Sequence, residues 1–211
     1  MKKILYILLF VPLLFISSCE EQSPIYGCLD SQAINYNSEA TIDNNSCEYL
    51  EICFAYQGGI IFYIDETGEH GLVAAMEDLG QFQWGCYQEY VDGSDGTSIG
   101  TGYHNTMDIV NQGCATENGG FTAAQAALDA EINGYNDWYL PSKDELVEMY
   151  NTIGNGGPEG NIGGFTTSNT PYYWSSSEYD YNFACFVFFS DGLSLYANKF
   201  NTYRVRPIRS F

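Results

Sequence analysis

The chain has 211 residues, with 27 acidic and 7 basic side chains and a formal net charge of −20. A length of this order suits one medium domain with small appendages. The acidity excludes nucleic acid and anionic lipid headgroups as favoured partners, because both repel a strongly negative surface.

The N-terminus predicts export. Two lysines precede an apolar run from Ile4 to Ile16, which is shorter than the roughly 20 residues that span a bilayer. A basic start and a short apolar run are typical of a signal peptide, here residues 1–18. The sequence ISSC that ends at Cys19 resembles a lipobox, which implies that Cys19 carries lipid. An ordinary signal peptide that happens to precede a cysteine is the alternative.

Residues 19–26 are polar and predict a tether between the lipid and the folded part. The two acids after Cys19 resemble the export signals of some Gram-negative surface lipoproteins. We therefore expect the protein at the outer membrane, exposed at the cell surface, with the lipid anchor as its only membrane contact.

Residues 27–49 form a polar segment bracketed by two cysteines, and they resemble a small cysteine-bounded repeat of secreted bacterial proteins. So short a segment cannot bury a core unaided, so we expect a Cys28–Cys47 disulfide to constrain it. Some of its side chains offer oxygen ligands of the type that calcium takes: Asp30, Asn35, Asn37, Asp43 and Asn45. Their spacing does not match the EF-hand, and Asx residues also form turns unaided. Beyond this calcium alternative, the sequence predicts no cofactor and no metal site.

Residues 52–211 form the predicted main domain. Two apolar segments joined by a turn at Asp65–Gly68 predict a β-hairpin, and residues 91–102 are a glycine-rich loop. Two helices follow. The first begins at Thr122 with a capping box to Gln125 and runs to a stop at Gly134, and the second runs from Ser142 to a stop at Gly154.

The stretch DWYLPSKDELVEMY, from Asp137 to Tyr150, concentrates serine, lysine and carboxylates. One interpretation is a catalytic cluster. The favoured one is a helix start, with Ser142 as N-cap, Glu145 completing a capping box and Glu148 on the solvent side. An apolar stripe at helical spacing predicts the buried face: Leu146, Met149, Tyr150 and Ile153.

The last 40 residues are β-rich and aromatic. In FACFVFF both alternating faces are apolar, which predicts a central strand covered on both sides. Pro207 belongs at a strand edge or end. Arg204, Arg206 and Arg209 are expected to pair with carboxylates on neighbouring strands, or alternatively to form an anion-binding patch.

Several motifs occur in one order: GGIIFYID, HGLVAA, WGC, IGTGYHNT, NDWYLPSKDEL, YYWSSSEY and RVRPIRSF. From Gly58 to Phe211 the chain thereby resembles the Lcl C-terminal domain family, which is similar to the C-type-lectin-like group. The resemblance implies an α+β domain of this type, with two helices flanking a curved, mostly antiparallel sheet whose first and last strands pair. The sugar-binding calcium motifs of C-type lectins and the paired cysteines of the related enzymes find no match.

Cys86 and Cys114 enclose the glycine-rich loop and a short helical stretch that contains His104. A disulfide between them is the favoured interpretation in an exported protein, and a nucleophilic cysteine served by His104 is the alternative. Cys53 and Cys185 either pair with each other or stay as buried free thiols.

Tyrosine and Asx side chains in the predicted turns of the β-rich end are the binding candidates, because tyrosine combines an apolar face with a hydroxyl. They are Tyr172, Tyr173, Tyr179, Asp180, Tyr181, Asn182, Asn198, Asn201 and Tyr203. The sequence thus predicts a surface lipoprotein that presents a non-enzymatic module for adhesion or recognition of glycan or protein ligands. The alternative is a structural envelope or matrix protein without a small ligand.

Overall fold

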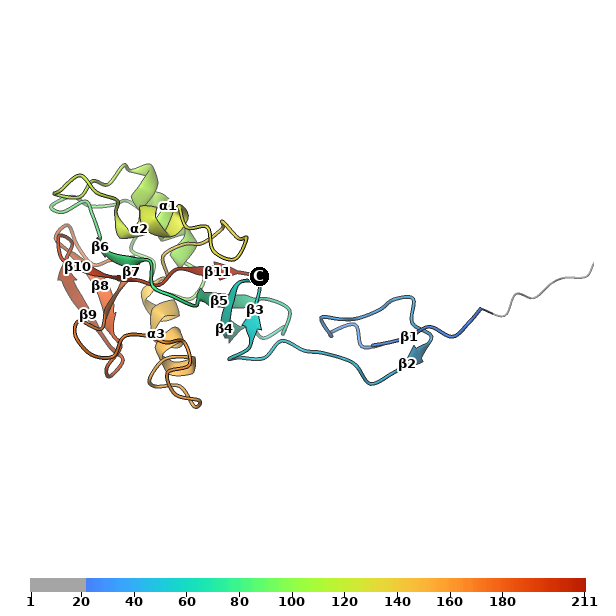
Figure 1. The fold of residues 1–211 in the computed structure, drawn as a ribbon. Helices are drawn as coiled ribbons and strands as arrows, with labels where there is room; N and C mark the ends of the chain where they lie inside the picture. The colour runs from blue at the N-terminus through green and yellow to red at the C-terminus, as the bar shows by residue number, and fades with distance from the viewer. Residues whose placement is uncertain (1–21) are drawn as a thin grey trace, which may run out of the picture. The chain divides into compact units, whose positions relative to one another are not determined.

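The computed structural model describes residues 22–211, so the predicted signal peptide and the lipidation site Cys19 lie outside the described residues. The chain divides into two compact units (Figure 1). The first ends at Glu48 and the second is Tyr49–Phe211. Within residues 22–211, none of the helices has the length and apolar character needed to cross a membrane.

The N-terminal unit has very little core. Strand β1 (Tyr26–Gly27) pairs in parallel with β2 (Ile42–Asp43), and the buried apolar residues described for this unit are Cys28 and Ala33. The predicted Cys28–Cys47 disulfide is present and closes a loop with a sequence separation of 19. This unit therefore depends on a covalent link and on local turns rather than on packing.

The C-terminal unit is a mixed α+β structure with two sheets and three helices. The four-stranded sheet has the order β11-β5-β4-β3, with bounds Ile208–Ser210, Gly71–Ala75, Gly59–Ile64 and Ala55–Tyr56. The five-stranded sheet has the order β6-β10-β7-β8-β9, with bounds Gly80–Gln83, Thr202–Val205, Tyr172–Glu178, Phe183–Phe188 and Leu193–Asn198. The β10–β7 pair is parallel and the other pairs are antiparallel.

The prediction that the first and last strands pair is wrong. The last strand, β11, pairs with β5, and the first strand of the unit, β3, lies at the other edge of the same sheet. The hairpin explains part of this arrangement, because β4 pairs with β3 on one edge and with β5 on the other and so has no free edge for β11. The free edge of β3 is only two residues long, and β11 pairs with the longer β5. The prediction for FACFVFF is confirmed, since β8 lies between β7 and β9 and the residues from Ala184 to Val187, which alternate between the two sides of the strand, are all buried. Pro207 falls between β10 and β11, at a strand end as expected.

The C-terminal unit contains three helices: α1 (Gly102–Asn111), α2 (Ala123–Leu128) and α3 (Lys143–Thr152). The sequence predicted α2 and α3 as helices and α1 only as a short helical stretch. The short helical stretch expected between Cys86 and Cys114 is α1, which at ten residues equals α3 in length. Helices α1 and α2 lie together, with strands between them and α3 (Figure 1).

Helix α2 is shorter than predicted and has half of its capping box. Thr122 accepts from the Gln125 backbone N–H, but the Gln125 side chain donates to Asp129 at 2.8 Å instead of returning to the cap. The chain then forms a two-residue turn whose central residues, Asn133 and Gly134, both have positive φ. Asn-Gly favours this turn, so Gly134 belongs to a hairpin and not to the end of the helix.

Helix α3 follows the prediction closely. Ser142 and Glu145 form the full capping box, and the helix buries Leu146, Met149 and Ile153 against the core. This core includes Tyr173, Val187 and Phe189 of the five-stranded sheet region. Glu148 is half-buried rather than on the solvent side, and burial raises the pKa of its carboxyl group.

Candidate binding site

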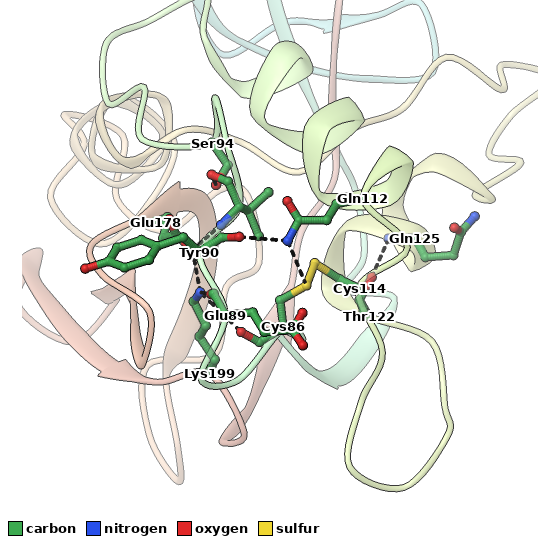
Figure 2. The surroundings of a disulfide bond; sticks show 11 residues. Cys86, Glu89, Tyr90, Ser94, Gln112, Cys114, Thr122, Gln125, Glu178 and Lys199 are labelled. Carbon is green, nitrogen blue, oxygen red and sulfur yellow. Dashed lines mark hydrogen bonds and ion pairs between the residues drawn. A yellow bond between two sulfur atoms is a disulfide. The ribbon is translucent and has the colours of Figure 1, made fainter.

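A loop from Cys86 to Val91 follows β6 and is anchored at several points. The predicted Cys86–Cys114 disulfide ties it to the segment after α1, so neither cysteine is a free nucleophile for His104. Gln112 of the same segment donates from Nε2 to the Tyr90 carbonyl at 2.7 Å. Figure 2 shows this disulfide and Gln112 beside the loop, with the Tyr90 ring directed away from the sulfur atoms.

A buried ion pair between the five-stranded sheet and the loop adds further anchors (Figure 2). Lys199 is fully buried and pairs with Glu178, the last residue of β7. Its Nζ also donates to the carbonyl oxygens of Glu89, at 2.8 Å, and Cys86, at 3.4 Å. Glu178 Oε1 accepts from the Val91 N–H at 2.9 Å. Burial lowers the pKa of Lys199, and the hydrogen bond to Glu178 opposes that shift. The Lys199 ammonium group donates to three oxygens and so links the loop to the end of β7.

The sequence WSSSE holds the glycine-rich loop that continues from Val91. The register between β7 and β8 is irregular from Trp174 to Glu178, which frees the three serines between them from the ladder. Each serine is fully buried. Ser177 Oγ donates to the Gly96 carbonyl at 2.7 Å, and the Glu178 N–H donates to the Ser94 carbonyl at 2.7 Å. Small polar residues suit this position because they satisfy loop carbonyls within a confined space.

The start of α3 holds the same loop from the other side. Ser142 Oγ donates to the Ser98 carbonyl at 2.9 Å, and Glu145 accepts from the Gly100 N–H at 2.8 Å and from the Ser142 N–H at 2.6 Å. Glu145 is fully buried; burial raises its pKa, and these backbone hydrogen bonds oppose the shift. The stretch from Asp137 to Tyr150 is therefore explained as scaffold, with Glu145 buried in a structural role.

Exposed tyrosines gather beside these anchored loops, at the turn between β7 and β8. Tyr179 stacks on Tyr196 of β9, with ring centroids 3.9 Å apart and an interplanar angle of 22°. The ring centroid of Tyr181, in the same turn, lies 5.7 Å from that of Tyr90. The four side chains are 45–66% exposed. We call Tyr90, Tyr179, Tyr181 and Tyr196 the tyrosine cluster.

The structure places two of the nine predicted binding residues, Tyr179 and Tyr181, in this cluster. Asp180 lies between them and forms the turn, because its Oδ1 accepts from the N–H groups of Asn182 and Phe183 at 2.7 and 2.9 Å. Asn182 and Asn198 are half-buried, and their Oδ1 atoms are buried without a hydrogen-bond partner among the described residues.

The other predicted tyrosines belong elsewhere. Tyr172 and Tyr203 are half-buried on the side of the five-stranded sheet that also carries Trp174, where the two rings lie 5.0 Å apart. Asn201 donates to the Tyr203 hydroxyl at 3.3 Å. Tyr173 was wrongly predicted as a contact residue, because β-strand alternation turns it into the core, fully buried, with its hydroxyl donating to Asp78 at 2.9 Å.

Sequence reasoning missed Tyr90 and Tyr196. Alternation along LSLYAN puts Tyr196 on the opposite side of the strand from Leu195, but Leu195 is itself exposed, so alternation alone does not identify Tyr196 as the solvent-facing residue. The sequence offers no signal for Tyr90 either, because its position depends on contacts between its loop and residues that are far away in the sequence: Gln112, Cys114, Glu178 and Lys199.

The three C-terminal arginines pair with carboxylates, as predicted, but these carboxylates lie in loops and not on neighbouring strands. Arg204 and Arg206 contact Asp78 at 3.3 and 2.8 Å, and Arg209 contacts Asp137 at 2.6 Å. Arg206 is also buried over the Phe165 ring, 4.2 Å from its centroid. These guanidinium groups are engaged in internal contacts, which does not favour the alternative of an anion-binding patch.

The sequence also pointed to the two histidines, two further cysteines and a set of possible calcium ligands. His70 and His104 are both exposed, and Cys53 and Cys185 are free thiols, half-buried and buried, rather than a pair. In the part of the chain from residue 22 on, no group of three His, Cys, Asp or Glu side chains is arranged to hold a metal ion. In the N-terminal unit the Asx side chains form turns: Asn37 and Asp43 accept from the N–H groups of Glu39 and Asn45.

The sequence model of one family, described as the Lcl C-terminal domain, matches residues 85–209. The match covers more than half of the chain, and the protein therefore belongs to this family. It includes both motifs that hold the glycine-rich loop, and it begins after β6, so the β4–β5 hairpin against which β11 pairs lies outside it. None of the curated proteins compared with the chain matches it.

Proposed function

We propose that the protein is a surface lipoprotein that presents a non-enzymatic, C-type-lectin-like binding module for a glycan or protein ligand, and that the tyrosine cluster is the contact surface. The observation that carries this proposal is the exposure of four tyrosines, 45–66% each, on segments held by a disulfide and a buried ion pair. Exposed apolar groups on rigid loops are typical of recognition surfaces.

The chemistry of the cluster suits a sugar ring or a protein surface. Tyrosine presents a flat apolar face and a hydroxyl at small entropic cost, and the stacked pair of Tyr179 and Tyr196 offers such a face to solvent. Because the segments that carry these tyrosines are held by the disulfide and the ion pair, binding does not require the loops to order first, which lowers the cost of association.

A glycan array probed with the full chain tests the proposal. We expect a bound glycan whose affinity falls by about tenfold, or ~1.4 kcal/mol, in Tyr179→Ala and in Tyr196→Ala. Tyr103→Ala is the matched control, because Tyr103 is 48% exposed on α1, outside the cluster, and its loss should leave binding unchanged.

Two results would count against this function. Equal weakening by the cluster variants and by Tyr103→Ala would show that the ligand does not use the cluster. Failure to bind any glycan or candidate protein would favour the structural envelope or matrix role instead. The proposed lipid anchor is checked separately, by the mass of the mature N-terminal peptide, which should begin at lipid-modified Cys19.

A further inference from the structure

Strand β9 is the one long sheet edge without a neighbour among the described residues of the C-terminal unit. The edge of β6 is bridged at Gln83 by Thr122, and the edge of β11 is bridged at Ile208 by Tyr139. The remaining edge of the four-stranded sheet is β3, which is two residues long. By contrast, β9 has six residues and pairs with β8 on one side.

The hydrogen-bond parity of β9 shows which backbone groups face outward. The Lys199 N–H donates to the Asn182 carbonyl across the ladder at 2.9 Å, so residues 197 and 195 also direct their N–H and C=O groups toward β8. Leu193 has the same parity, but at this end of the strand its N–H donates to Asp191 Oδ1 at 3.0 Å. Residues between these positions point away from β8. The Asn198 carbonyl already accepts from the Asn201 N–H. Ser194 and Tyr196 are therefore the outward residues with both backbone groups open, which gives four groups, and the Asn198 N–H is a fifth.

This edge carries none of the usual protection against pairing with another strand. Its sequence, LSLYAN, contains no charged residue and no proline, and its register with β8 runs without a bulge from Phe183–Asn198 to Phe188–Leu193. Leu193, Leu195 and Tyr196 are 55%, 45% and 52% exposed. Natural sheet edges are normally protected by charges, proline or bulges, so an edge lacking all three is suited to pairing.

We propose that β9 pairs antiparallel with β9 of a second copy of this chain, about a two-fold axis. One register uses both backbone groups of both residues: Ser194 lies opposite the partner's Tyr196, and Tyr196 opposite the partner's Ser194. That register places Leu195 opposite the partner's Leu195 on the two-fold axis. The two five-stranded sheets then become continuous, and each exposed leucine gains an apolar neighbour.

A second copy suits this edge for two reasons. The strand is its own complement in this register, and isologous two-fold contacts are the commonest in homo-oligomers. The net charge of −20 opposes self-association over most of the surface, but β9 is an uncharged stretch where two copies can meet. A contact through one strand edge is smaller than the roughly 1,600 Å² of a standard stable interface, so the association is reversible.

Disulfide trapping of the full chain tests this arrangement. Residues that face each other in a non-hydrogen-bonded antiparallel pair have Cα atoms roughly 4.5 Å apart, within the range that a disulfide bridges. Under mild oxidation, Leu195→Cys should give a reducible dimer at least tenfold more abundant than that of the unmodified chain, whose other cysteines provide the background.

Leu193→Cys is the matched control, because it is at least as exposed but would lie about 14 Å from its counterpart, four residues along the strand. It should give no dimer above background. Ser194→Pro added to Leu195→Cys should abolish trapping, since it removes an outward N–H and no bond to β8; circular dichroism checks that the fold is retained. Equal trapping at 193 and 195, or trapping that persists with Ser194→Pro, overturns the proposed pairing. So does a Leu195→Cys chain that stays monomeric, which would leave the edge to an extended segment of another protein.

Discussion

The two units of this chain each contain one disulfide, and the comparison shows how differently the same bond can matter. In the N-terminal unit, Cys28–Cys47 closes a segment with almost no buried apolar residues. In the C-terminal unit, Cys86–Cys114 closes a loop that already lies against a packed core and a buried ion pair. The loop-entropy contribution of the two bonds is similar, because their sequence separations are 19 and 28 and the entropy depends only on the logarithm of loop length. The two units should therefore differ in how much folded structure each keeps after its disulfide is broken.

The largest expected effect is the loss of the N-terminal disulfide. Replacing both of its cysteines, Cys28→Ser with Cys47→Ser, removes about 3 kcal/mol of loop-closure stabilisation, and no core remains to hold the unit. Hydrogen exchange should then show full loss of protection at the Ile34 and Ile42 amides, whose partners are the carbonyls of Glu48 and Ile25.

The matched control replaces Cys86 and Cys114 together. Here the amide of Tyr139, which bonds to the Ile208 carbonyl, should keep its protection, while the loop around Tyr90 exchanges faster. If the N-terminal amides stay protected without their disulfide, contacts other than the disulfide stabilise this unit. If the C-terminal unit unfolds in the control, its core is weaker than its packing indicates.

A smaller effect is expected from the polar contacts that hold the glycine-rich loop. In Glu145→Gln one acceptor oxygen becomes an NH₂ group, which then faces either the Gly100 or the Ser142 N–H. A buried donor without an acceptor costs about 1–3 kcal/mol, measured as the loss of unfolding free energy in urea. Asp144→Asn is the control, because its side chain is 41% exposed and pairs with Lys143 at the surface; it should change stability by less than about 0.5 kcal/mol. Equal effects of the two substitutions would contradict the role assigned to Glu145.

Some features depend on residues close together in the chain and others on residues far apart, and this difference explains what the sequence could predict. The capping box of α3, its apolar stripe and the two disulfides depend on signals close together in the chain, and all are present. The pairing of β11 with β5 and the position of Tyr90 depend on distant segments, and sequence periodicity carries no information about partners. The predicted end of α2 at Gly134 is wrong although the Asn133-Gly134 signal is local, because glycine is common both after a helix and in a two-residue hairpin turn.

The candidate site shows the same limit at the level of single residues. Tyr172 and Tyr173 are adjacent and chemically alike, yet the first is half-buried on an outer sheet surface and the second lies in the core. Alternation requires that they face opposite ways, but the sequence does not say which side of the strand meets α3. Only the packing of Leu146, Met149 and Phe189 decides that Tyr173 is the internal one.

The smallest expected effect concerns an ion pair in the unit that already has a core. Asp137 accepts from Arg209 Nε and Nη2 at 2.6 and 2.8 Å, and these hydrogen bonds hold the pKa of Asp137 below its usual value. Arg209 also donates to Gln57 Oε1 at 2.7 Å and lies over the Tyr135 ring, so it keeps partners when Asp137 is changed. Because the Asp137 side chain is 54% exposed, Asp137→Asn should cost less than about 1 kcal/mol at pH 7.

The pH dependence of that small cost has a definite sign. A carboxyl group with a depressed folded-state pKa contributes stability above its unfolded pKa, about 3.9, and loses it as the pH falls through the folded value. The difference in unfolding free energy between the unmodified chain and Asp137→Asn should therefore be largest near pH 7 and shrink toward zero below about pH 3. Urea titrations at several pH values measure it, with the exposed Asp92→Asn as control. A difference that keeps its size down to pH 2 would mean that Asp137 acts through packing rather than through its charge.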